Sequence, residues 1–189
     1  MTDMDDSIRR QILSLRVSQP EDALYGKNAD IQDILLSSDE YINAKNILCY
    51  ADCRGEVKTD GIIADALAKG KKVYLPLCEE NYSMNFYSIA SMDDCVKGHY
   101  GIAEPVADER KRFSQSDCAS ETIIIVPGVV FDRKHNRMGY SKGYYDRFLI
   151  RFDGIYKIAL AFDFQVVEEL CAKPWDVPMD KIITENGII

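Results

Sequence analysis

The segment Thr122–Val126 is the feature that most constrains how this chain can fold. It reads Thr-Ile-Ile-Ile-Val, with no polar residue after its first position. β-branched side chains favour extended backbone, and an apolar run that does not alternate with polar residues is typical of a parallel strand that is covered on both faces. Parallel strands need crossover connections, which are usually helices. The segment therefore predicts the central strand of an α/β sheet.

Short apolar runs elsewhere alternate with helical patterns, as such a sheet requires. Further strands are expected at 46–50, 72–77, 156–161 and 182–184, and helices at 59–69 and 144–151. Thr59 is expected to cap the first of these helices, and Gly70 to end it. Segment 84–88 alternates apolar and polar residues, which predicts an antiparallel or edge strand.

Two amphipathic helices are expected before the first strand. Ile8, Ile12 and Leu15 recur at helical spacing. Pro20 and the acidic residues after it predict the start of a second helix, which runs towards Leu36. No internal repeat or low-complexity linker interrupts the chain.

The predicted fold class is therefore α/β, with a single domain over residues 1–189. We expect a mostly parallel open sheet with helices on both faces, in a Rossmann-like arrangement of three layers. Residues 1–37 are expected to form an N-terminal helical segment packed on this core. Ligands of such open sheets bind beyond the carboxyl ends of the strands.

Composition argues against several classes of function. Asp and Glu number 31 and Lys and Arg 23, which gives a net charge of −8. Because no basic patch offsets this charge, nucleic-acid binding is not expected. No apolar run approaches the roughly 20 residues of a membrane span, and the polar, acidic start of the chain does not resemble a signal peptide. Membrane association is not expected.

The cysteines and histidines narrow the chemistry further. The six cysteines form no C-x-x-C pair, and the chain has two histidines. Structural zinc needs closely spaced pairs of these residues, so it is not expected. Six free thiols in a reducing compartment are the simplest interpretation, which predicts a cytoplasmic protein.

Chemically active residues concentrate in segment 137–146, which reads Arg-Met-Gly-Tyr-Ser-Lys-Gly-Tyr-Tyr-Asp. Gly139 and Gly143 are expected to let the backbone approach a ligand and turn at positive φ. Backbone amides at the start of the following helix would point at an anion, with Arg137 and Lys142 beside it. Asp146 is placed to hold Mg²⁺ next to phosphate oxygens. Together these features predict a nucleotide-phosphate site.

Three other interpretations of this segment compete. The pattern Gly139-x-Ser141-x-Gly143 matches the nucleophile elbow of serine hydrolases, but both His99 and His135 precede the serine, whereas a triad histidine follows it. Neither a P-loop nor a dinucleotide-binding fingerprint occurs. A glycine turn that only caps a helix is the structural alternative, and the segment taken alone leaves it open.

The wider pattern from Val126 to Arg147 resembles a family signature. It reads V-P-G-x-x-F-D, then a short loop, then R-x-G-Y-x-K-G-Y-Y-D-R. This order resembles the 5-formyltetrahydrofolate cyclo-ligase family, also called methenyltetrahydrofolate synthetases. Further matches run along almost the whole chain, among them Glu56-Val57-x-Thr59, 70–73, 101–105 and Asp176 to Asp180. The resemblance implies a fold like that of the NagB/RpiA/CoA-transferase-like proteins.

The resemblance also implies a reaction. The family closes 5-formyltetrahydrofolate to 5,10-methenyltetrahydrofolate, with ATP as co-substrate and Mg²⁺ as cofactor, and releases ADP and phosphate. Transfer of the γ-phosphoryl group to the formyl oxygen activates the carbon for attack by N10 of the folate. Such a transfer depends mainly on positioning and on charge stabilisation. The implied partners are small molecules, including polyglutamylated folates as an open possibility, and we expect a monomer or a weak homodimer.

Roles for individual residues follow from the same resemblance. Lys142 and Arg137 are expected to act in catalysis, and Asp146 and Asp176 to hold the metal. The implied ATP-binding residues are Arg9, Arg137, Met138, Gly139, Tyr140, Ser141, Lys142, Gly143, Tyr144 and Tyr145. The implied folate-binding residues are Ala51, Glu56, Tyr140, Ser141, Lys142, Gly143 and Tyr144.

Two departures from the family pattern keep a second class of function open. Ser141 stands where the family usually has glycine, which predicts a stiffer loop. Asp5 stands near where relatives often carry a lysine for ATP, so the N-terminal contact to ATP depends on Arg9 alone. The alternative is a folate- or nucleotide-binding module without turnover.

Overall fold

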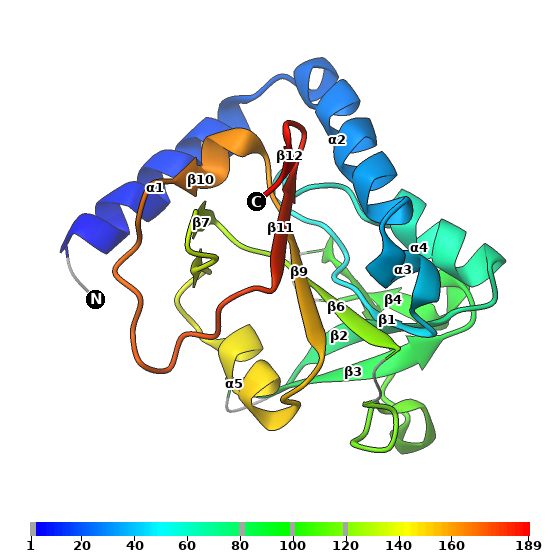
Figure 1. Cartoon of the computed structure of the whole chain (residues 1–189). Helices are drawn as coiled ribbons and strands as arrows, with labels where there is room; N and C mark the ends of the chain where they lie inside the picture. Colours follow the sequence, from blue (N-terminus) through cyan, green and yellow to red (C-terminus); the bar gives the residue numbers. More distant parts are fainter. Residues whose placement is uncertain (1–2, 80–81, 99–100, 119–120) are drawn as a thin grey trace.

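A seven-stranded sheet forms the centre of the protein in the computed structural model (Figure 1). The structure describes residues 3–79, 82–98, 101–118 and 121–189. The order of the strands is β12-β11-β9-β6-β1-β2-β3. They are β1 (Asn46–Leu48), β2 (Lys72–Cys78), β3 (Met84–Ile89), β6 (Thr122–Val126), β9 (Tyr156–Leu160), β11 (Lys181–Thr184) and β12 (Gly187–Ile188).

The interior of this sheet is parallel and its two borders are antiparallel. Strands β11, β9, β6, β1 and β2 pair in parallel, whereas β3 pairs antiparallel with β2, and β12 antiparallel with β11. All five residues of β6 are buried, which confirms the predicted central strand. The prediction of an antiparallel edge strand at 84–88 is also confirmed.

Helices cover both faces of the sheet, so the predicted layered α/β arrangement is confirmed. On one face lie α2 (Glu21–Leu36), α3 (Asp39–Asn43) and α4 (Asp60–Ala68), and on the other lies α5 (Tyr144–Arg151). Successive residues of a strand point to opposite faces. Ile125 accordingly packs with the core that includes Ile31 and Ile62, and Ile124 with the core that includes Phe148 and Leu149.

A second, smaller sheet carries the N-terminal helix. It consists of β10 (Val166–Val167), β7 (Val130–Asp132) and β8 (Arg137–Met138), in that order. Helix α1 (Asp3–Ser18) packs on it through Ile12, which lies in one apolar cluster with Val129, Val130 and Leu170. Figure 1 shows α1 beside β7 and β10, away from α3 and α4. The sequence did not predict this sheet.

The remaining differences from the predicted elements are local. Strand β1 ends at Leu48, and a hairpin of β4 (Cys95–Lys97) and β5 (Ala103–Pro105), like α3, was not predicted. Thr59 precedes α4 as predicted, but its hydroxyl donates to the Tyr50 carbonyl oxygen and does not cap the helix. Gly70, at a φ of +70°, follows the end of α4.

Two residues named in the sequence analysis have side chains that the structure does not describe. Asp5 belongs to α1 but its side chain is not described, and His99 lies outside the described residues. Within the described ranges, no helix combines the length and apolar character that crossing a bilayer requires.

The direction in which successive strands are added to the main sheet reverses at β1. From β1 the chain continues to β2 on one side, and it returns to β6 on the other side of β1. In open α/β sheets such a reversal creates a crevice beyond the carboxyl ends of the strands, where ligands bind.

Candidate active site

A pocket of about 630 Å³ opens beyond the ends of β1 and β6. Its walls come from α1, from the segments that follow β1 and β6, from the start of α5 and from the segment between β10 and β11. All the predicted site residues line it. They are Arg9, Ala51, Glu56, Arg137, Met138, Gly139, Tyr140, Ser141, Lys142, Gly143, Tyr144, Tyr145, Asp146 and Asp176.

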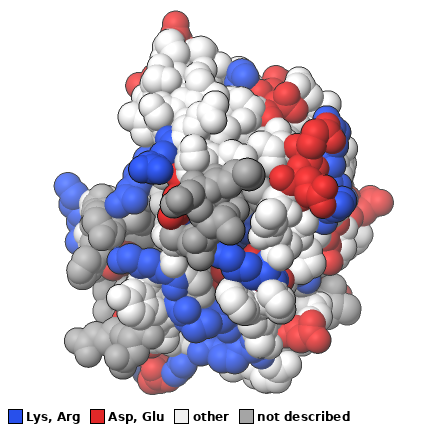
Figure 2. Space-filling model, turned by 90° about the vertical axis from the view of Figure 1, so that its left-hand side faces the viewer, with Lys and Arg blue, Asp and Glu red and all other residues white. Residues whose placement is uncertain are grey.

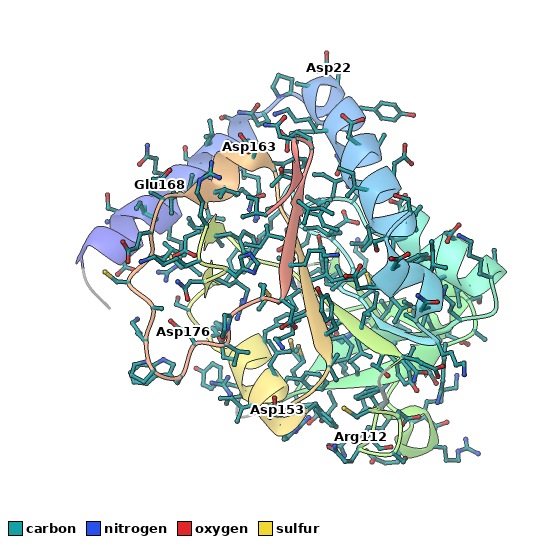
Figure 3. All side chains as sticks on the ribbon, in the orientation of Figure 1. Asp22, Arg112, Asp153, Asp163, Glu168 and Asp176 are labelled. Atoms are coloured by element: carbon teal, nitrogen blue, oxygen red, sulfur yellow. The ribbon has the colours of Figure 1, made fainter. Side chains whose placement is uncertain are left out.

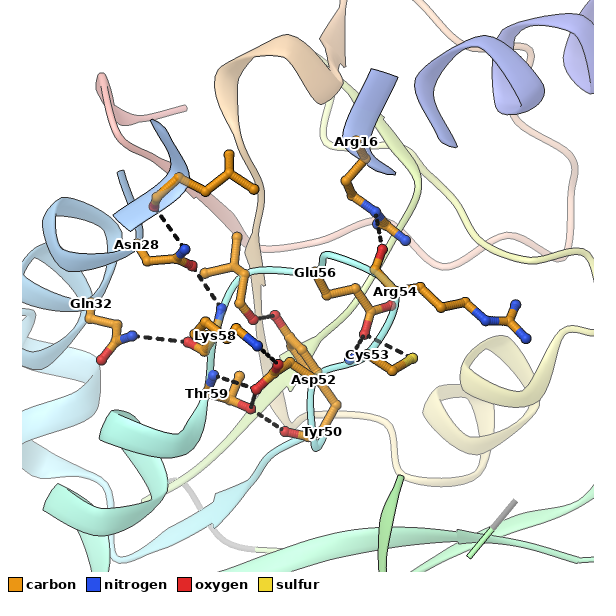
Figure 4. Close-up of polar contacts among 12 residues, drawn as sticks. Arg16, Asn28, Gln32, Tyr50, Asp52, Cys53, Arg54, Glu56, Lys58 and Thr59 are labelled. Atoms are coloured by element: carbon orange, nitrogen blue, oxygen red, sulfur yellow. Dashed lines mark hydrogen bonds and ion pairs between the residues drawn. The ribbon is translucent and has the colours of Figure 1, made fainter. Parts of the chain in front are cut away.

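The segment 51–59 forms one wall, and side chains hold it in shape (Figure 4). Asp52 accepts a hydrogen bond from the backbone N–H of Thr59 at 3.1 Å and forms an ion pair with Lys58 at 3.0 Å. From α2, the side-chain oxygen of Asn28 accepts from the backbone N–H of Lys58 at 2.8 Å. These contacts between groups of the chain itself fix the wall.

Glu56 is a buried carboxylate in this wall, with 7% of its surface exposed. One carboxylate oxygen accepts from the backbone N–H of Cys53 at 3.1 Å, and the other accepts from the Tyr140 hydroxyl at 3.2 Å. Burial raises the pKa of Glu56, and the positive charge of Arg16 opposes that rise. Burial, together with the charge of Glu56, raises the pKa of Tyr140 to about 12. The phenol is therefore a hydrogen-bond donor at neutral pH.

Arg16 lies beneath this wall, and the sequence analysis did not assign it to the site. Its side chain is buried, with 1% of the residue exposed. From α1 it donates to the carbonyl oxygens of Arg54 at 3.0 Å and Gly128 at 3.1 Å, and to the hydroxyl of Tyr140. The signal in the sequence was its spacing from Arg9, since residues about two turns apart lie on one face of a helix.

The segment 139–143 forms an adjoining wall. Positive φ falls at Ser141 (68°) and Gly143 (64°), so the prediction of a positive φ at Gly139 is wrong. A Cβ at residue 139 would lie 2.8 Å from Nη1 of Arg137, so a larger residue there would require the Arg137 side chain to shift. Ser141 and Lys142 are exposed, and Lys142 extends its ammonium group to 5.9 Å from the ring centre of Tyr82.

Two arginines flank this second wall. The buried side chain of Arg137 donates from Nη2 to Asp146 at 2.7 Å and from Nη1 to the Pro127 carbonyl oxygen at 3.4 Å. Its Nε is a buried donor with no partner among the described residues. Arg9 of α1 donates from Nε to the Gly139 carbonyl oxygen at 3.0 Å. These groups place positive charge and an unused donor beside the pocket.

Asp146 and Asp176 reach the pocket from different elements. Asp146 lies in the first turn of α5, and Asp176 lies in the long segment between β10 and β11 (Figure 3). Asp176 also accepts from the backbone N–H of Lys173 at 2.8 Å. The described residues contain no cluster of three or more His, Cys, Asp or Glu side chains that could hold a metal. Two carboxylates in one pocket nevertheless fit Mg²⁺, which commonly takes its other ligands from phosphates and water.

This acidic protein carries several basic side chains at its pocket. Figure 2 shows Lys and Arg side chains gathered across the middle and lower part of one face. Five cationic residues line the pocket: Arg9, Arg137, Lys142, Arg147 and Lys173. A net charge of −8 therefore does not prevent a small polyanion from binding here.

Comparisons with known proteins point to one family. Residues 1–185 match the model of the 5-formyltetrahydrofolate cyclo-ligase family. A probable 5-formyltetrahydrofolate cyclo-ligase from Schizosaccharomyces pombe is 29% identical over 79% of this chain and 79% of its own. The mitochondrial 5-formyltetrahydrofolate cyclo-ligase of Arabidopsis thaliana is 30% identical over 97% of this chain and 72% of its own.

Solved structures agree in fold. The NMR structure of a 5,10-methenyltetrahydrofolate synthetase from Aquifex aeolicus matches 98% of this chain and 91% of its own, with a TM-score of 0.84 and 31% identity. A 5,10-methenyltetrahydrofolate synthetase from Mycoplasma pneumoniae, at 23% identity, has a TM-score of 0.76 and supports the fold alone.

Proposed function

The chain belongs to the 5-formyltetrahydrofolate cyclo-ligase family, and from its pocket we propose how it carries out this family's reaction. It is an ATP-dependent enzyme that closes 5-formyltetrahydrofolate to 5,10-methenyltetrahydrofolate. The proposal rests on one observation. Segment 137–146, whose amides and cations suit a phosphate group, lines the same pocket as the buried carboxylate of Glu56. The two substrates would meet where Tyr140 joins these walls.

The nucleotide phosphates lie along segment 137–146 in this proposal. Amides at the start of α5, after the turn at Gly143, point at the phosphates. The unused Nε of Arg137 donates to a phosphate oxygen. Lys142 is exposed in the structure, so its ammonium group is free to move onto the γ-phosphoryl group.

The folate lies against Glu56 and Ala51. A pterin ring offers adjacent N–H and amino donors, which match the two oxygens of a carboxylate. Among the described residues, one oxygen of Glu56 accepts from the Tyr140 hydroxyl alone, whereas the other accepts from the backbone N–H of Cys53 and, at 3.6 Å, from its thiol. A lone pair of the first oxygen is therefore left for the pterin. Tyr144 supplies an aromatic surface at the pocket wall.

The chemistry follows from this placement. The formyl oxygen attacks the γ-phosphorus, the bond from that phosphorus to the bridging oxygen breaks, and ADP leaves. Nitrogen N10 then attacks the activated carbon and loses its proton to solvent, and phosphate leaves with the former formyl oxygen. Lys142 and Arg137 neutralise the negative charge that is shared among the phosphoryl oxygens during the transfer.

Asp146 and Asp176 would hold Mg²⁺ in this scheme. When bound, the ion supplies positive charge to the phosphates of ATP. Two carboxylates suffice for this task, because the phosphates are ligands too.

We also propose a cytosolic location for this chain, although the relative from Arabidopsis thaliana is named mitochondrial.

A turnover assay tests the proposal. The protein is incubated with 5-formyltetrahydrofolate, ATP and Mg²⁺, and the near-ultraviolet absorbance of the methenyl product is followed together with the release of ADP. Both should rise in equal amounts. A folded protein that binds the substrates in calorimetry but releases no ADP would be the binding module without turnover, and the proposal would be rejected.

A further inference from the structure

Arg16 contacts three segments that are far apart in the sequence. They are the wall 51–59 at Arg54, the turn after β6 at Gly128, and the segment 139–143 at Tyr140. No carboxylate of the described residues forms an ion pair with its guanidinium group within 4.0 Å. Burying a charge without a direct ion pair is expensive, so each donor of the guanidinium group needs an acceptor. Arg16 finds these acceptors on three separate segments of the pocket and therefore fixes them relative to one another.

The hydrogen bonds around Tyr140 have only one possible direction. A guanidinium group can only donate, so the Tyr140 oxygen accepts from Arg16. The single hydroxyl hydrogen is then left for Glu56, whose carboxylate oxygen lies 3.2 Å away. Since the backbone N–H of Cys53 holds the second carboxylate oxygen, the carboxylate is kept in one orientation.

We propose that Arg16 is a positioning residue for the folate, because it holds Tyr140 and, through that hydroxyl, the carboxylate of Glu56. The inference rests on the proposed function, in which the folate lies against Glu56. Arg9, about two turns earlier on α1, holds the Gly139 carbonyl on the nucleotide side. Helix α1 thus contacts the folate side of the pocket through Arg16 and the nucleotide side through Arg9.

The charge of Arg16 adds a second effect that can be measured. It opposes the rise in the pKa of Glu56 that burial causes. The other titratable or charged groups around this network are Cys53, Arg54, Tyr50, Tyr140 and Tyr145. Removing Arg16 should raise the pKa of Glu56 further, and the acid limb of kcat/KM for the folate should then move to higher pH.

The test compares Arg16→Met with Arg10→Met. Arg10 is an exposed arginine on the same helix, and it donates to the Asp6 carbonyl oxygen. Arg16→Met should raise KM for the folate roughly 10- to 100-fold, the size expected when a hydrogen bond that involves a charged group is lost. KM for ATP should change much less than KM for the folate, and Arg10→Met should change neither constant. Parallel rises of both KM values would overturn the proposal.

Arg16→Lys separates the charge from the geometry. Lysine keeps the positive charge but not the planar fork of donors. The acid limb of the pH profile should return towards that of the wild type, while KM for the folate stays raised. An acid limb that is the same in Arg16→Met and the wild type would contradict the charge effect.

Tyr140→Phe removes only the hydroxyl group through which Arg16 is proposed to hold Glu56. Alone this substitution should raise KM for the folate. Adding Arg16→Met should raise KM little further, because the effects of two residues that act through the same hydrogen bond are not additive. Fold-changes that multiply would mean that Arg16 does not act through Tyr140.

Should Arg16→Met fail to fold, Tyr140→Phe and Arg16→Lys still decide the question. A wild type without turnover would reject the proposed function instead, and calorimetric folate affinities of the same variants would then decide this inference.

Discussion

Segments 51–59 and 139–143 both line the pocket and meet at the hydrogen bond between Tyr140 and Glu56, but they differ in what holds them. In 51–59 the side chain of Asp52 and the neighbouring helix α2 fix the backbone. In 139–143, Ser141 and Lys142 are exposed, and the anchors are arginines that donate to carbonyl oxygens at Gly139 and Lys142. A flat, rigid pterin suits a preformed wall, whereas a flexible triphosphate suits a wall with an exposed lysine. We therefore expect changes in 139–143 to affect turnover most, and changes in 51–59 to affect stability or folate binding.

Lys142→Ala should give the largest effect. We expect kcat to fall about 100- to 1,000-fold, because in the proposed mechanism Lys142 stabilises the charge of the transition state. The free energy of unfolding should change by less than about 0.5 kcal/mol, because the side chain is exposed. Steady-state kinetics and urea unfolding measure the two quantities, with the exposed Lys45→Ala as the control. A loss of stability as large as the loss of kcat would make Lys142 a structural residue and remove the contrast.

Glu56→Gln should raise KM for the folate by about 10- to 100-fold and leave KM for ATP unchanged, since it replaces a charged acceptor in the folate wall. An equal rise in both constants, measured by initial rates, would mean that the walls do not divide the substrates as proposed.

The same variant makes a prediction about pH and stability. Burial raises the pKa of Glu56 above its usual 4.5, so native protein binds more protons than unfolded protein between the unfolded and folded pKa values. The contribution of Glu56 to the free energy of unfolding of the wild type therefore falls as pH rises through that window. Glutamine cannot ionise, so the stability of Glu56→Gln relative to the wild type should increase through the window and level off above it. Urea unfolding at a series of pH values checks this, and a relative stability that decreases with rising pH would contradict it.

Asp52→Ala should mainly lower stability. It removes the acceptor for the Thr59 backbone N–H and the partner of Lys58, for which we expect a loss of about 1 to 3 kcal/mol in the free energy of unfolding. Asp52 does not line the pocket, so kcat of the folded fraction should stay close to that of the wild type. The exposed Asp30→Ala on α2 is the control. Unchanged stability would show that this wall is not fixed as described.

Ser141→Gly should give the smallest effect and the opposite sign. A serine at a φ of 68° is strained by about 1 kcal/mol, and the greater freedom of glycine in the unfolded chain offsets part of the gain. We expect a gain in stability of at most about 0.5 kcal/mol. The matched change is Gly143→Ala, which should destabilise the protein, because the new Cβ would lie 2.9 Å from Nη1 of Arg147 at a φ of 64°. Thermal unfolding of the two variants compares them directly.

The sequence predicted most of the main sheet because its strands carry their signal locally. The uninterrupted apolar run of β6 and the alternation in β3 are each explained by the faces these strands cover. The small sheet could not be predicted in the same way. Strands of two or three residues, such as β8 and β10, carry little pattern, and β10 pairs with β7 from a distant part of the sequence.

The site shows the same division between local and distant causes. The residues from Arg137 to Asp146 were recognisable because they are contiguous, and they do line one pocket. Arg16 was not assigned to the site, because an arginine on an amphipathic helix is usually exposed, and its three acceptors lie 38 to 124 residues away. The positive φ at Ser141 was missed because the sequence directs attention to the glycines on either side of it.

The antiparallel borders of the main sheet bear on how the protein behaves when concentrated. Strand β12 has two residues, and beyond β3 the backbone N–H of Phe113 already donates to the Phe86 carbonyl oxygen at 2.8 Å. Among the described residues, the short length of β12 and the pairing of Phe86 limit the backbone that a second molecule could use to extend the sheet. We expect purified samples to resist fibril formation on storage, and thioflavin fluorescence over time would reveal the contrary.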